Sequence, residues 1–148
     1  MALRGLSVLL VEDHPDHREL GRTLLVHLGA RVDMAEDGER GLEKMRKTYP
    51  DLVLCDLLMP HMDGYEFARR VRRIPDCERV CLVALTSLHD DTAYLRTWCA
   101  GFDAHLEKPV TLSKLNEMAE RFMLTRPARR PRRRRKAPSS SSSSPSRF

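Results

Sequence analysis

The feature that most constrains the fold is a fivefold alternation of short apolar runs with segments of helical spacing. Residues 6–11, 52–55 and 80–85 are apolar runs bounded by polar or turn residues, and residues 32–35 and 104–106 are weaker runs. Apolar runs of this length are typical of parallel strands that are buried on both faces. Strict alternation of strands with helices predicts an α/β fold, a five-stranded parallel sheet that is doubly wound, with helices on both faces.

The segments between these runs have apolar side chains at three- and four-residue intervals, which indicates helices. A fourth helix is predicted over residues 92–99, with a stop at Gly101 and with Tyr94 and Trp98 expected to pack. The core-facing side chains predicted for the others are Leu20, Leu24, Leu25 and Leu28, then Leu42, Met45 and Tyr49, then Phe67, Val71 and Ile74, and in the fifth helix Leu112, Leu115, Met118, Ala119 and Phe122.

Residues with chemically useful side chains stand directly after four of the predicted strands. These residues are Glu12 and Asp13, then Asp56, Thr86 and Lys108. In a parallel α/β sheet the ligand site lies outside the carboxyl ends of the strands. We therefore expect the five side chains to meet in one crevice.

Three carboxylates in one crevice repel one another unless a cation lies among them. Oxygen ligands with open positions suit Mg²⁺, and one divalent cation with the Lys108 ammonium balances the three negative charges. A carboxylate such as Asp56 can attack phosphorus to form an aspartyl phosphate. Mg²⁺, Lys108 and the Thr86 hydroxyl would then hold the phosphoryl oxygens.

Each of these residues also has an ordinary structural interpretation. Asp13 could cap the first helix, Asp56 could start a turn, Thr86 could end a strand and Lys108 could be a solvated surface charge. Taken together, these interpretations do not explain why all of these residues follow strands of one alternating pattern.

Four segments resemble the signature regions of the response-regulator receiver family. They are VLLVEDHPD at residues 8–16, DLVLCDLLMPHMDG at 51–64, ALT at 84–86 and KPV at 108–110. The resemblance extends over roughly residues 5–124 and implies the flavodoxin-like receiver fold. It also implies that Asp56 is phosphorylated and that Glu12, Asp13, Asp56 and the Leu58 backbone carbonyl bind Mg²⁺.

The resemblance further implies that Thr86 moves toward the phosphoryl group and that Lys108 precedes a cis peptide bond to Pro109. Three residues before the lysine the family usually has Tyr or Phe, whose ring swings inward with the threonine, and this chain has His105. His105 could act as the switch residue with Thr86, with a response to pH near neutrality. Equally, it could be a half-exposed residue with no switching role.

The charge of the chain is unevenly distributed. Nine of the 26 Lys and Arg side chains follow Thr125, where there is no Asp or Glu, so residues 1–125 hold 17 basic and 21 acidic side chains. We expect a receiver domain at residues 1–125 and a disordered Arg/Pro/Ser-rich tail at residues 126–148. The tail could make weak electrostatic contacts with nucleic acid or an acidic surface, or it could simply be solvated.

Other compositional features indicate a cytoplasmic protein. The longest apolar run near the start is too short for a membrane span and lacks a cleavage region. The cysteines, which have no CxxC spacing, are expected to be buried reduced thiols. They are Cys55, Cys77, Cys81 and Cys99.

Together these features predict a single-domain response regulator in two-component signalling. It would receive phosphate from a histidine kinase or phosphotransfer protein and signal through its fourth-helix to fifth-helix face. It would be a signalling domain and not an enzyme, catalysing only its own Mg²⁺-dependent phosphorylation and dephosphorylation. The alternative is a phosphorylation-independent scaffold or nucleic-acid-associated module that acts through its tail. An aspartyl phosphatase would need a second acid where Leu58 stands.

Overall fold

The predicted strands form one five-stranded parallel sheet in the computed structural model, which describes residues 1–87 and 91–125. The strand order is β2-β1-β3-β4-β5. The strands are β1 (Ser7–Val11), β2 (Arg31–Ala35), β3 (Leu52–Asp56), β4 (Cys81–Thr86) and β5 (Ala104–Glu107). Val11 is in register with Ala35 and Cys55, and Asp56 is in register with Leu85. The carboxyl ends of neighbouring strands are therefore level with one another.

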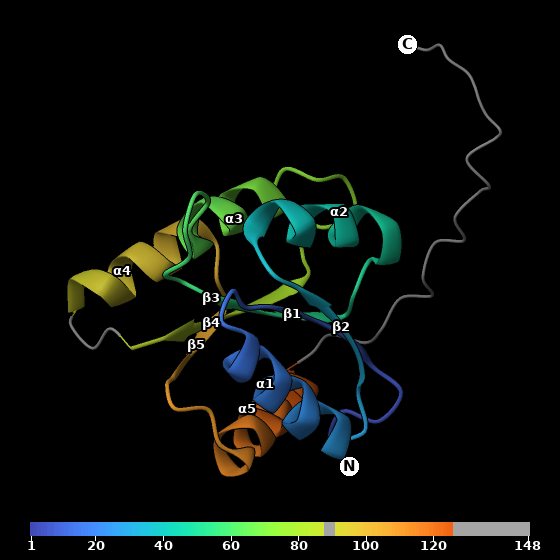
Figure 1. The fold of residues 1–148 in the computed structure, drawn as a ribbon. Helices are drawn as coiled ribbons and strands as arrows, with labels where there is room; N and C mark the ends of the chain where they lie inside the picture. The colour runs from blue at the N-terminus through green and yellow to red at the C-terminus, as the bar shows by residue number, and fades with distance from the viewer. Residues whose placement is uncertain (88–90, 126–148) are drawn as a thin grey trace, which may run out of the picture.

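Five helices cover both faces of the sheet. Figure 1 shows α2, α3 and α4 on one face and α1 and α5 on the other. The helices are α1 (Pro15–His27), α2 (Gly38–Thr48), α3 (Gly64–Val71), α4 (Asp91–Ala100) and α5 (Leu112–Thr125). This arrangement confirms the doubly wound fold. The expected tail at residues 126–148 lies outside the described residues.

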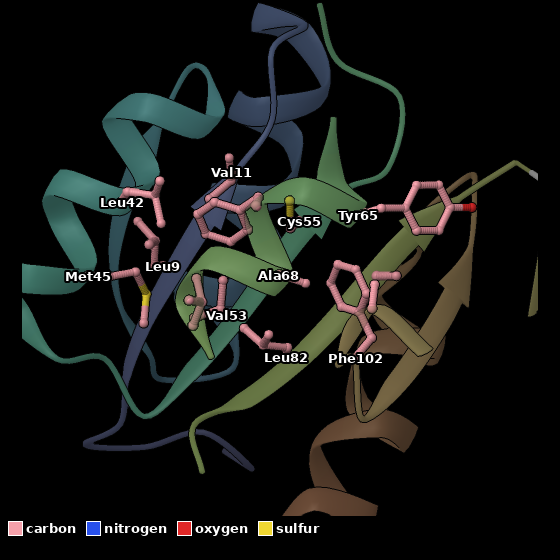
Figure 2. Packing of buried hydrophobic residues seen from close by; sticks show 14 of the residues in the cluster. Leu9, Val11, Leu42, Met45, Val53, Cys55, Tyr65, Ala68, Leu82 and Phe102 are labelled. Atoms are coloured by element: carbon pink, nitrogen blue, oxygen red, sulfur yellow. The ribbon is translucent and has the colours of Figure 1, made fainter. Parts of the chain in front are cut away.

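Alternation along the strands divides the apolar side chains into two cores. Leu9 and Val11 of β1 contribute to the core beneath α2 and α3, while Val8 and Leu10 contribute to the core beneath α1 and α5. Figure 2 shows the first core, to which Phe102, between α4 and β5, also contributes. Because successive side chains of a strand point to opposite faces, each central strand supplies both cores. This explains why the strands read as continuous apolar runs.

Three connections between strands and helices have specific local conformations. The N-cap of α1 is His14, whose side chain accepts a hydrogen bond from the Asp16 amide, so the interpretation of Asp13 as the cap is wrong. The Lys108–Pro109 peptide bond is cis, as the family resemblance implied. Gly29, with a φ of 96°, follows the end of α1 in the conformation that glycine adopts readily.

Several predicted core positions are exposed. Leu20 is 49% exposed, and Gly21 occupies the core-facing position instead, where an added Cβ would lie 2.8 Å from the Leu10 Cδ2 atom. A helix can approach a strand closely at a glycine, and a pattern of apolar side chains does not register this. Leu112 is also exposed, and Trp98 is 69% exposed, so the expected packing of Trp98 is wrong.

The cysteines are all free thiols, but they are not all buried. Cys55 and Cys77 are buried, Cys81 is half-buried and Cys99 is exposed on α4. The prediction of buried thiols is therefore wrong for Cys99. None of the helices in residues 1–87 and 91–125 has the length and apolar character that crossing a bilayer requires.

Candidate functional site

The connection from β1 to α1 carries two carboxylates. The Glu12 amide donates to the Ala35 carbonyl (3.0 Å), which extends the pairing of β1 with β2 by one residue. The Glu12 side chain turns inward and is 2% exposed, and its Oε2 accepts a hydrogen bond from the His14 amide (3.2 Å). Asp13 follows in a half-buried position. Both acids therefore stand at the carboxyl edge of the sheet.

Asp56 is the last residue of the central strand β3, and it is buried. The Leu58 amide donates to Asp56 Oδ1 (3.3 Å), and the Gly64 amide donates to the Leu57 carbonyl (2.9 Å). A Cβ on Gly64 would overlap the Asp56 carbonyl and lie 2.8 Å from the Leu57 Cα atom. The N-terminus of α3 therefore packs directly on the backbone of Asp56.

Lys108 connects the acids to β5. Its amide donates to the Thr86 carbonyl (2.8 Å), and its Nζ atom lies 3.2 Å from both Glu12 Oε1 and Asp56 Oδ2. Burial of the ammonium lowers the Lys108 pKa, but attraction to Asp56 and Glu12 outweighs this and leaves the pKa above its ordinary value. Lys108 is therefore charged and held between two carboxylates.

Glu12, Asp13 and Asp56 form an acidic cluster in which one carboxylate oxygen from each lies within 4.8 Å of the others. Burial raises the pKa of Glu12, and repulsion by Asp56 raises it further, although the His14 amide and Lys108 act in the opposite direction. Carboxylate oxygen donors at this spacing fit a hard divalent cation such as Mg²⁺.

The remaining predicted residues lie close by on β4 and β5. Thr86 is the last residue of β4 and is buried. His105 lies on β5 in register with Ala84, and its ring packs against that of Tyr94 of α4, with 4.3 Å between the ring centroids and an angle of 30° between the ring planes. The structure therefore brings the acids and the lysine together and places His105 against α4.

Two residues near the site were not predicted. Gly64 belongs to the segment at residues 51–64 that resembles the family, but the residue type alone does not show that it packs against the Asp56 backbone. Arg18, on α1, donates from Nη1 to the carbonyl oxygens of Glu12 (2.8 Å) and Asp13 (3.4 Å). An arginine in the second turn of a predicted helix has an ordinary surface interpretation, so the sequence offered no signal for this contact.

Residues 8–120 match the family model of the response regulator receiver domain. The chain belongs to this family. The receiver domain is 35% identical over 128 residues to an uncharacterized 14.6 kDa protein of Leptolyngbya boryana, with 84% of this chain and 95% of that protein covered. It is 38% identical over 125 residues to the aerobic respiration control sensor protein ArcB of Escherichia coli, covering 82% of this chain and 16% of ArcB.

A solved structure agrees with both the fold and the family. The receiver domain of the sensor histidine kinase PA1611 of Pseudomonas aeruginosa is 29% identical, with a TM-score of 0.76, and 82% of this chain and 99% of that chain are covered. That structure has a magnesium ion coordinated in its active-site cleft. The family places this receiver domain in two-component signalling and phosphorelay.

Proposed function

We propose that this receiver domain accepts a phosphoryl group on Asp56 from a histidine kinase or phosphotransfer protein. The observation that carries the proposal is the position of the Asp56 carboxylate. It lies 3.2 Å from the Lys108 ammonium and within 4.8 Å of two other carboxylates, at the carboxyl end of the central strand. A phosphorylation-independent scaffold would not need this combination of charges.

The chemical step transfers one phosphoryl group. An Asp56 carboxylate oxygen forms a bond to phosphorus while the bond from phosphorus to the donor nitrogen of phosphohistidine breaks. The nitrogen keeps the electron pair of that bond, and the proton on the other ring nitrogen of the phosphohistidine makes the leaving group a neutral imidazole. The transfer depends on positioning and on stabilising charge at the phosphoryl oxygens, because the protein has little covalent chemistry to perform. Lys108 and the Thr86 hydroxyl would each stabilise one of these oxygens.

Glu12, Asp13, Asp56 and the Leu58 carbonyl would hold Mg²⁺. When bound, the ion neutralises charge on the carboxylates and on the phosphoryl oxygens. The fit rests on the donor set, since three carboxylates and one ammonium leave an excess of negative charge that a divalent cation balances. The magnesium ion in the related receiver domain of PA1611 supports this assignment.

The output would be phosphorylation-dependent binding through the face formed by α4, β5 and α5. Leu95 and Trp98 of α4 are exposed, and a groove of about 550 Å³ lies between β5 and α5, lined in part by His105. The contact between the His105 and Tyr94 rings gives a physical link from β5 to α4. Thr86 and His105 would form the switch. Residues 1–125 would form the receiver domain, with the tail contributing at most weak electrostatic contacts.

Phosphorylation is tested by incubating the full chain with acetyl phosphate and Mg²⁺ and measuring intact mass. Wild type is expected to gain one phosphate and Asp56→Asn to gain none. Lys108→Ala is the informative control, because it leaves the acceptor in place and should still be labelled. Equal labelling of wild type and Asp56→Asn would remove Asp56 as the acceptor.

The switch is tested separately with His105→Tyr, which restores the residue type usual in the family. The reporter is the fluorescence of Trp98 on α4. In wild type, this emission is expected to change on phosphorylation. His105→Ala should reduce that change, while His105→Tyr should retain it. An unaltered response in His105→Ala would assign His105 a packing role only.

A further inference from the structure

The connection between β1 and α1 bends away from the direction of the strand. In a strand, successive carbonyl groups point in opposite directions. The carbonyl oxygens of Glu12 and Asp13 instead both lie within hydrogen-bonding distance of one nitrogen, Nη1 of Arg18. The chain therefore leaves the extended conformation between these two residues. This turn also allows two successive carboxylates to face Asp56.

Arg18 is well placed to hold this turn. Its backbone amide donates to the His14 carbonyl (2.9 Å), which fixes Arg18 in the first turns of α1. Nη1 carries two hydrogens, which match the two carbonyl acceptors. The distances are 2.8 Å to Glu12 and 3.4 Å to Asp13, so the contact with Glu12 is the stronger one. The guanidinium joins the helix to the two residues that follow β1.

The contact is with the backbone and not with the carboxylates. The Arg18 guanidinium donates to the carbonyl oxygens of Glu12 and Asp13. Within residues 1–87 and 91–125, the ion pairs of the acidic cluster are made by Lys108. The charge of Arg18 alone would repel a bound cation, so any increase in Mg²⁺ affinity that Arg18 provides acts through the position of the chain.

We propose that Arg18 is a positioning residue for Mg²⁺, which holds the Glu12–Asp13 turn in the conformation that directs both carboxylates to one ion. The proposal rests on the proposed function, because it assumes that the acidic cluster binds Mg²⁺. Groups that orient metal ligands typically change metal affinity by about 10- to 100-fold when they are removed. Loss of the Arg18 contacts is expected to weaken Mg²⁺ binding by about tenfold, at the lower end of this range.

The experiment compares Arg18→Met with Arg22→Met in the full chain. Arg22 lies one turn further along α1 and pairs with Glu19, so its removal takes away the same charge from the same helix without touching the turn. The Mg²⁺ dissociation constant is measured by isothermal titration calorimetry, after metal removal with EDTA. Arg18→Met should bind about tenfold more weakly than wild type, and Arg22→Met should bind within about twofold of it.

A third variant, Arg18→Lys, keeps the charge but presents a shorter stem and a tetrahedral ammonium, so it does not span both carbonyls. Its Mg²⁺ affinity is expected to lie between that of Arg18→Met and that of wild type. If circular dichroism shows that Arg18→Met does not fold, Arg18→Lys decides the matter, with a dissociation constant at least about threefold above wild type expected. A wild-type constant in the folded Arg18 variants overturns the proposal.

The outcomes separate this proposal from the proposed function. If wild type binds no Mg²⁺ and gains no phosphate from acetyl phosphate, both the proposed function and the inference about Arg18 are wrong. If wild type does both and Arg18→Met binds Mg²⁺ equally well, the inference alone fails. Arg18→Met should also recover the wild-type rate of phosphate uptake at saturating Mg²⁺, because a positioning residue acts on the affinity. A rate that stays low at saturation with an unchanged dissociation constant contradicts the role.

Discussion

Glu12, Asp13 and Asp56 bring three negative charges together, and Lys108 contributes the ammonium that pairs with two of them. Like charges at these distances near a protein surface repel one another by a few kcal/mol. The half-buried Asp13 has no ion pair with Lys108 among the described contacts, in contrast to the other two acids. In the absence of a cation, this group of charges should therefore oppose folding.

Asp13→Asn is expected to stabilise the protein by about 1 kcal/mol in EDTA, since it removes a like charge of this cluster. Wild type should gain about 2.7 kcal/mol when Mg²⁺ is a hundredfold above its dissociation constant, and the variant should gain much less. Urea unfolding with EDTA and with Mg²⁺ measures both effects. A variant less stable than wild type in EDTA would show that Asp13 makes a structural contact that outweighs the repulsion.

The cysteines should differ in reactivity because their surroundings differ. Burial raises the Cys77 pKa to about 11, and the Cys55 pKa lies well above its ordinary value. Because the thiolate is the reactive form, a pKa of about 11 leaves only about one thiolate in a thousand at pH 8. Cys99 is exposed and is expected to react first.

Timed iodoacetamide labelling of the folded chain, followed by peptide mass spectrometry, measures these rates. Labelling of Cys77 should rise with pH up to about 11, where the thiolate becomes the main form. Cys99→Ser should lose the fast phase. Rapid labelling of Cys55 at neutral pH would mean that the core beneath Asp56 opens readily.

The charged residues of the site could be predicted from the sequence, because ligand sites of parallel α/β sheets lie at the carboxyl ends of the strands. Glu12, Asp56 and Lys108 were found in this way. Arg18 and the exposed Cys99 could not be, since their environments depend on which side of a helix faces the sheet. In α1, Gly21 packs closely against Leu10, and an apolar pattern does not register a glycine at a core-facing position.

At the scale of elements, the connection between β3 and α3 is held by close packing and by hydrogen bonds. Gly64 begins α3 directly against the Asp56 backbone, with its amide bonded to the Leu57 carbonyl. Asp63 caps the helix by accepting from the Glu66 amide (2.9 Å). The strand, the loop and the helix are therefore held as one unit around Asp56.

Gly64→Ala is expected to destabilise the protein by roughly 2–3 kcal/mol, because the added methyl group meets backbone atoms that have little room to move. It should also slow phosphate uptake, since relief of the overlap displaces Asp56. Gly5→Ala is the control: its φ is 77°, but nothing lies within 4 Å of the added Cβ. It should cost about 1 kcal/mol and leave phosphate uptake unchanged. Chemical denaturation and intact-mass labelling distinguish the two variants.

The strands were predicted to within one or two residues because buried strands are continuous apolar runs. The order of the strands, β2-β1-β3-β4-β5, was not predicted from the alternation, because that pattern fixes the sequence of elements but not which strands are neighbours. The helix boundaries were also close, yet the exposure of Trp98 and Leu112 was not foreseen. Residues at the ends and edges of helices can meet solvent or partners without a change in the apolar spacing.

At the scale of the whole molecule, two cores on opposite faces of one sheet account for the described fold. Every buried residue of both cores lies between Leu3 and Ala119. A chain that ends at Thr125 should therefore unfold in one cooperative transition with a free energy within about 0.5 kcal/mol of the full chain. Phosphate uptake should also be retained. Thermal and urea unfolding of the two chains test this, and a clear loss of stability would assign the tail a structural role.

The two contacts of Lys108 carry a consequence for signalling. A single ammonium serves as the counterion of both Glu12 and Asp56. We expect phosphorylated Asp56 to draw this ammonium toward the phosphoryl oxygens, which would weaken the contact between Lys108 and Glu12. The phosphoryl group and Glu12 would then compete for the Lys108 ammonium. The group that binds the ammonium would set the position of the chain that joins β5 to α5. On this view, the covalent state of the central strand is converted into movement at the edge of the sheet by the exchange of one counterion.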